Sequence, residues 1–175
     1  MLVPKDIATA LIFIPLVLSI SYMDVRYRRI PNKQVLTILL CGIALNTFFG
    51  AWPGFLGSLL GMVIAFALML MLHILGTMGA GDVKLFAAIG AVLGSSLVLQ
   101  TFVIVALTGG LLAILKMVYM RRAATTMLSV VQFFVGFLPG QTVPRFTVPA
   151  DRNYTLPYAV PICLGSVVSF FLFRV

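Results

Sequence analysis

Residues 55–75 read FLGSLLGMVIAFALMLMLHIL and contain no Asp, Glu, Lys or Arg. An α-helix needs roughly 20 apolar residues of this kind to cross the hydrocarbon core of a bilayer. Similar stretches recur along the chain, which is 62% hydrophobic and 9% charged over its 175 residues. A soluble domain of this size could not bury so much apolar surface, because much of any folded surface stays in water. The sequence therefore predicts an all-α, polytopic membrane protein.

Six segments are predicted to form transmembrane helices, at about residues 7–23, 35–51, 55–75, 83–99, 101–119 and 156–174. The fourth is short and is interrupted by Gly90 and Gly94. Small residues spaced by four, at Gly57-xxx-Gly61 and at Gly90-xxx-Gly94, are expected to let helices pack closely. Because the helices leave little other chain, we expect a single membrane-embedded domain over residues 1–175, with a cytoplasmic connector at about 120–155.

The basic residues predict the orientation of these helices. Twelve Lys and Arg residues against four acidic ones give a net charge of +8. In the six-helix topology all but two of them fall on one side of the membrane or at its edge: Arg26, Arg28, Arg29, Lys33, Lys84, Lys116, Arg121, Arg122, Arg145 and Arg152. Cytoplasmic loops carry such an excess, so this side is predicted to be cytoplasmic and both termini to lie outside. The orientation of the helices and contacts with anionic lipid headgroups explain the excess of basic residues. Membrane lipids are therefore expected partners, and nucleic acid is not.

The four acidic residues are all aspartates: Asp6, Asp24, Asp82 and Asp151. The stretch GTMGAGDVKLF at residues 76–86 puts Asp82 after a run of glycines, at the cytoplasmic start of the fourth helix. Asp24 falls at the cytoplasmic end of the first helix. An acid where a chain enters the membrane is costly and marks a candidate functional site. Taken singly, Asp24 could pair with a nearby arginine and Asp82 could cap a helix, but the pair at one depth favours function.

Two carboxylates in a partly dry site have a specific chemistry. They cannot both ionise easily, so they share a proton and titrate as a pair. The ionised one can take a proton from water while the protonated one polarises a peptide carbonyl, which is aspartic-protease chemistry without a metal. We expect Gly79 and Gly81 to adopt backbone angles closed to other residues, and to let an extended peptide approach.

Other chemistries have few residues to support them. His73 is the only histidine, and we expect it to have a hydrogen-bonded packing role within an apolar helix. Cys41 and Cys163 lie in apolar runs and form no CxxC pair, so a structural zinc site has no ligands. No metal and no cofactor are predicted, and a metal site made of two aspartates and His73 is a weaker alternative. A proton-coupled small transporter that uses the aspartates as a relay is an alternative, and a non-catalytic assembly protein is another.

Three motifs extend the argument: YMDVRYRRIPN at residues 22–32, GAGDVKL at 79–85 and LPYAVPI at 156–162. With the six-helix layout, they resemble the type IV prepilin peptidases, which are GxGD membrane aspartic proteases. The resemblance implies a hydrolase of the bacterial inner membrane with Asp24 and Asp82 as its catalytic residues. Such an endopeptidase removes leader peptides at the cytoplasmic face, and its substrates are prepilins or pilin-like proteins with an N-terminal leader and a hydrophobic helix.

The resemblance also indicates a branch of this family. Long-form members carry an extra cytoplasmic region with paired CxxC motifs and N-methylate their product. The chain has no such motif, so it is similar to the small branch that serves Flp, or tight-adherence, pili (CpaA/TadV-like), and methyl transfer is not expected. Archaeal preflagellin peptidases share the GxGD core and are an alternative.

Several residues near the two aspartates are predicted to shape the active-site loops and the approach of substrate. Pro31 and Asn32 indicate a turn and the start of the second helix. Lys84 is expected either to lower the pKa of Asp82 or to extend its side chain to the lipid headgroups. Residues 123–138 are expected to form a membrane-hugging connector, with guidance of the substrate helix as the alternative. The full predicted set is Gly79, Gly81, Lys84, Arg28, Arg29, Pro31 and Asn32.

Overall fold

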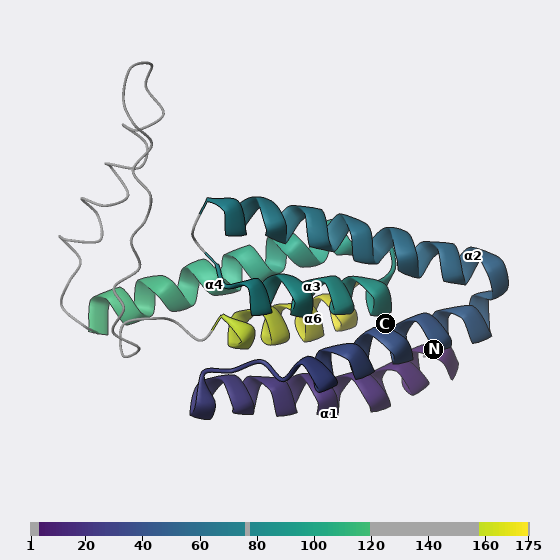
Figure 1. The fold of residues 1–175 in the computed structure, drawn as a ribbon, viewed down its shortest axis with the longest axis horizontal. Coiled ribbons are helices and arrows are strands. Elements are labelled where there is room, and N and C mark those ends of the chain that lie inside the picture. The colour runs from purple at the N-terminus through teal and green to yellow at the C-terminus, as the bar shows by residue number, and fades with distance from the viewer. Residues whose placement is uncertain (1–3, 76–77, 120–157, 175) are drawn as a thin grey trace, which may run out of the picture.

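A computed structural model describes residues 4–75, 78–119 and 158–174 of the chain. In these residues all regular secondary structure is α-helical and no strand occurs (Figure 1). The helices are α1 (Pro4–Tyr27), α2 (Asn32–Ile74), α3 (Ala80–Leu93), α4 (Val98–Tyr119) and α6 (Ala159–Arg174). The predicted all-α fold is confirmed. The predicted connector at about 120–155, with its segment 123–138, lies outside the described residues.

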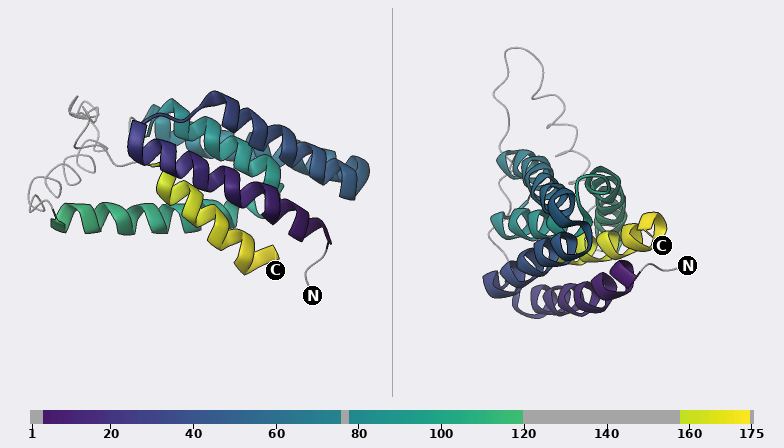
Figure 2. Two further views of the ribbon diagram at one scale, coloured as in Figure 1. Left: turned by 90° about the horizontal axis from the view of Figure 1, so that it is seen from below. Right: turned by 90° about the vertical axis from the view of Figure 1, so that its right-hand side faces the viewer.

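Helix α2 is a hairpin of two antiparallel halves (Figures 1 and 2). Its 43 residues would extend roughly 65 Å if straight, about twice the thickness of the roughly 30 Å hydrocarbon core. The chain turns at Ala51, whose φ of 47° and ψ of −139° are not helical. Pro53 follows, and a proline cannot donate a helical hydrogen bond. This turn falls at the boundary predicted between the second and third apolar segments.

Helix α3 lies at the centre of the bundle, and 11 of its 14 residues are buried. A helix that is apolar on nearly all sides is typical of such a buried position or of a membrane span. It begins at Ala80 and ends at Leu93, because Gly94 turns the chain with a φ of 80°. Helix α4 then begins at Val98. The structure thus differs from the predicted fourth segment at 83–99, whose last residues belong to this turn and to α4.

A buried polar network joins the α2 hairpin to the end of α3. The side-chain amide of Asn46 donates hydrogen bonds to Ser58 Oγ at 2.8 Å and to the carbonyl oxygens of Ala91 and Val92 at 2.9 and 3.0 Å. The Ser58 hydroxyl donates to the Ala91 carbonyl at 2.8 Å. The last carbonyls of a helix have no partner within that helix. This network satisfies two of them and ties both halves of α2 to α3.

Glycines allow the backbone of the second half of α2 to contact the backbone of α3 directly. A Cβ placed on Gly61 would meet the carbonyl oxygen of Gly90, and a Cβ on Gly90 would lie 2.5 Å from Ala65 Cβ. The two helices cross closely at this point because neither residue has a side chain. The contact joins the two glycine motifs noted in the sequence, and Ser95 N–H donates to the Gly57 carbonyl beside it at 3.1 Å.

The outer surface of the bundle is apolar. Within the described residues, three helical stretches are long and apolar enough to cross a membrane: Pro4–Tyr27, Asn32–Ile74 and Val98–Leu115. Their side chains largely face outward, and Leu11 and Leu107 are 72% and 68% exposed. A soluble monomer rarely exposes so much apolar surface. The protein is therefore a membrane protein, whereas the six crossings stay a prediction.

Candidate active site

Successive helical segments run in opposite directions, so distant parts of the chain share one end of the bundle (Figures 1 and 2). The last turn of α1 and the first turns of α3 and α6 lie at this end, together with the two outer ends of the α2 hairpin. The start of α1 and the end of α6 lie at the opposite end. The arrangement brings Asp24, Asp82 and Ala159 to the same end of the molecule.

Asp24 lies near the end of α1, and only 8% of its surface is exposed. Its Oδ2 accepts a hydrogen bond from the backbone N–H of Ala159 at 3.2 Å. The first N–H groups of a helix have no partner within that helix, so the carboxylate satisfies one of those of α6. Arg28, at a φ of 52° just after α1, lies close enough for its charge to act on the Asp24 carboxylate.

Asp82 lies in the first turn of α3 and is equally buried, at 8% exposure. Its Oδ2 accepts a hydrogen bond from the backbone N–H of Gly79 at 3.2 Å. Gly79 is the N-cap of α3, so the carboxylate also stabilises the start of this helix. The structural role considered for Asp82 is therefore present, as an acceptor at the third helical position rather than as the N-cap itself.

The two glycines of the GxGD motif have ordinary backbone conformations. Gly79 has a φ of −78° and a ψ of 151°, which any residue adopts, and Gly81 is part of α3. The prediction that both need angles closed to other residues is wrong. A Cβ on Gly79 would lie 3.2 Å from Asp82 Oδ2, which is a tight contact, whereas one on Gly81 would lie 3.4 Å from the Ile30 side chain, which is an ordinary van der Waals contact.

The two carboxyl groups act on one another. Asp82 lies outside the three long apolar helices, and burial together with the charge of Asp24 raises its pKa to about 6. The Gly79 hydrogen bond lowers the pKa of Asp82 and only partly offsets these causes. Two carboxylates that interact in this way titrate as a coupled pair. Asp24 and Asp82 thus have the chemical properties of an acid–base pair.

The other residues predicted for this site are Arg28, Arg29, Pro31, Asn32 and Lys84. Arg28 acts on Asp24, as described above. Pro31 is the N-cap of α2, with a φ of −69°, and Asn32 is the first residue of that helix. Arg29 and Lys84 are exposed, and the neighbouring charge that acts on Asp82 is that of Asp24.

His73 supports the loop that leads to Asp82. Its Nδ1 lies 2.7 Å from the carbonyl oxygen of Met78. Because a carbonyl only accepts, this nitrogen carries the proton and donates it. The expected hydrogen-bonded packing role is therefore observed. No group of three potential metal-ligating side chains occurs in the described part of the chain.

Sequence reasoning missed the contribution of α6. Tyr158 and Ala159 stand within the quoted LPYAVPI motif, yet nothing in the motif itself says that an N–H at this position meets Asp24. The contact joins residues 135 positions apart, so it depends on how α6 docks against α1. The order of apolar segments predicts only that the start of α6 shares an end of the bundle with Asp24.

The fold and the site define a class: an all-helical membrane protein with two interacting, buried carboxyl groups at one end of its bundle. Residues 11–114, more than half of the chain, match the type IV leader peptidase family. The chain belongs to this family.

Two relatives are both named prepilin leader peptidase/N-methyltransferase. The protein from Bacillus subtilis (strain 168) is 31% identical over 109 residues, which cover 61% of the chain and 43% of the relative. The protein from Myxococcus xanthus (strain DK1622) is 25% identical over 167 residues, which cover 91% of the chain and 50% of the relative. The chain thus spans half or less of the length of these curated relatives. No solved structure matches it.

Proposed function

We propose that the protein is a membrane aspartic endopeptidase that removes the leader peptide of Flp-type prepilins at the cytoplasmic face of the bacterial inner membrane. The observation that carries the proposal is the buried pair Asp24 and Asp82, whose charges interact at one end of the bundle. Family membership supports the class of reaction, and the names of the two relatives support a prepilin as substrate.

The proposed reaction uses the two carboxyl groups in opposite states. The ionised one accepts a proton from water, whose oxygen bonds to the carbonyl carbon of the scissile peptide. The protonated one transfers its proton to the carbonyl oxygen, which gives a neutral tetrahedral intermediate with two hydroxyl groups. The first carboxyl then protonates the amide nitrogen while the second takes back a hydroxyl proton. The C–N bond breaks, an acid and an amine leave, and both carboxyl groups regain their starting states.

The proposed side of catalysis follows from the basic residues. Arg26, Arg28, Arg29 and Lys33 lie between the end of α1 and the first turn of α2, and Lys84 lies in the first turns of α3. These positions belong to the end of the bundle that holds Asp24 and Asp82 (Figure 1). Basic residues accumulate in cytoplasmic loops, which supports a cytoplasmic active site.

Substitution of either aspartate tests the proposed function. Asp24→Asn and Asp82→Asn keep the size of the side chain and remove the titratable group, so each should reduce cleavage of a co-expressed prepilin by at least about 100-fold. Asp6→Asn and Asp151→Asn are controls and should process the prepilin normally. Immunoblots of membranes check that every variant accumulates. Near-normal processing by either of the first two variants would exclude that residue from catalysis and refute the carboxyl-pair mechanism.

A further inference from the structure

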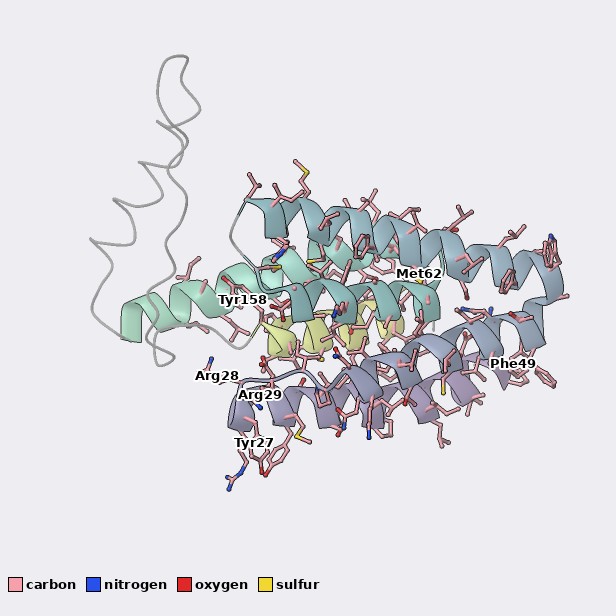
Figure 3. The ribbon with its side chains drawn as sticks, in the orientation of Figure 1. Tyr27, Arg28, Arg29, Phe49, Met62 and Tyr158 are labelled. Carbon is pink, nitrogen blue, oxygen red and sulfur yellow. The ribbon has the colours of Figure 1, made fainter. Side chains whose placement is uncertain are left out.

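The first turn of α6 is the third helical segment at the site, beside the end of α1 and the start of α3. Helix N-termini favour negative charge because their N–H groups point outward along the axis. The N–H of Ala159 points at Asp24 Oδ2, 3.2 Å away. This N–H belongs to the peptide bond that joins Tyr158 to Ala159, so the hydrogen bond also holds the backbone of Tyr158 beside Asp24. Figure 3 shows Tyr158 at the same end of the bundle as Arg28 and Arg29.

The side chain of Tyr158 is suited to donate a hydrogen bond. It is half-buried, and burial together with the charge of Asp82 raises the pKa of its hydroxyl. The hydroxyl therefore keeps its proton at any pH at which the pair works. Within the described residues the hydroxyl makes no hydrogen bond, although Asp82 is near enough for the two groups to interact. A neutral donor is thus present near one carboxyl of the pair.

We propose that Tyr158 is a third catalytic residue of the peptidase centre, whose hydroxyl donates a hydrogen bond to the carbonyl oxygen of the scissile peptide. The inference rests on the proposed function. The donor is useful because negative charge develops on that oxygen while water adds to the carbonyl carbon, before the proton from the carboxyl pair arrives. Two acidic groups provide no fixed positive charge there, whereas an O–H dipole stabilises the charge without being deprotonated.

The role requires no change in the balance of the reaction. Tyr158 keeps its proton throughout, and the protonated member of the pair still supplies the proton that the carbonyl oxygen receives. When the C–N bond breaks, the oxygen becomes a carbonyl again and the hydrogen bond weakens. The Tyr158 hydroxyl therefore acts mainly in the transition state, so its removal should lower kcat more than it raises KM.

Tyr158→Phe tests the proposal, because it removes only the hydroxyl. With purified protein in lipid nanodiscs and a synthetic prepilin peptide, we expect kcat to fall by about 100-fold, the typical loss for one oxyanion donor, with KM changed by less than about twofold. The matched control is Tyr27→Phe, whose tyrosine lies near the same end of the bundle but is 56% exposed (Figure 3). It should have the kcat and KM of the unmodified protein.

Two results would overturn the proposal. One is an unchanged kcat in Tyr158→Phe, and the other is a raised KM at constant kcat, which would make Tyr158 a binding residue. Thermal unfolding shows whether the variant folds. If it does not, 3-fluorotyrosine at position 158 keeps the ring and makes only the hydroxyl more acidic. An altered kcat at constant KM supports the donor role, and identical kinetics refute it. If the unmodified protein itself fails to cleave, the proposed function fails, and this inference with it.

Discussion

The peptidase activity should fall as the pH rises through about 6, because the mechanism needs one protonated carboxyl. Burial and the charge of Asp24 raise the pKa of Asp82 from 3.8 to about 6. A shift of roughly two units corresponds to about 3 kcal/mol of preference for the protonated form. A carboxyl with a raised pKa holds its proton below that pKa and loses it above. Above the midpoint, kcat/KM should drop about tenfold for each further pH unit.

Substitution of Gly79 tests whether the pKa of Asp82 sets the pH midpoint of kcat/KM. The Gly79 N–H donates to Asp82 Oδ2 and stabilises the ionised form. The Gly79 φ of −78° lies in the range of proline, so Gly79→Pro removes this donor, and the proline ring that replaces the N–H pushes the Asp82 carboxylate away. A hydrogen bond to a charged group contributes about 1.5–3 kcal/mol, or about one to two pH units. Because the lost bond favours the ionised carboxylate, the alkaline midpoint should move to higher pH.

The matched control is Gly79→Ala, which adds a Cβ at the same place, 3.2 Å from Asp82 Oδ2, and keeps the N–H. Its midpoint should move less than that of Gly79→Pro. The assay is kcat/KM for cleavage of a synthetic prepilin peptide between pH 4 and 9, in nanodiscs and at constant ionic strength. A profile that stays flat to pH 8 would refute the requirement for a protonated Asp82 in the reaction. Equal shifts in the two variants would refute the role of the Gly79 hydrogen bond.

Asn46→Leu should destabilise the folded protein by about 2 kcal/mol, because it removes the buried hydrogen bonds from the Asn46 amide to the Ala91 and Val92 carbonyl oxygens; thermal unfolding in detergent measures this. Thr47→Val is its control and should have little effect, since the Thr47 hydroxyl bonds only to a carbonyl of its own helix. Single cysteines at residues 28–31, in a chain without Cys41 and Cys163, should resist a membrane-impermeant thiol reagent in intact cells. Ready labelling from outside would reverse the proposed orientation.

Much of the fold could be predicted because it depends on local properties of the chain. The length of an apolar run limits where a membrane helix begins and ends, and the turn after Gly50 was visible as a break between two such runs. The number of helices between Asp24 and Asp82 is enough to bring both to one end, because successive helices alternate in direction. The fourth helix was misplaced because hydropathy does not distinguish the turn at Gly94 from a helix.

By itself, the sequence determined that this is an all-helical membrane protein, and that two acids lie at one end of its bundle. Only the tertiary structure decided which groups surround them. The bond from Ala159 N–H to Asp24, and the nearness of Tyr158 to Asp82, depend on how α6 is rotated and docked. That docking results from close contacts of the kind made by Gly165 in α6, where a Cβ would lie 2.8 Å from the Val105 side chain. Side-chain packing across helices sets such rotations, and no local pattern in the chain encodes them.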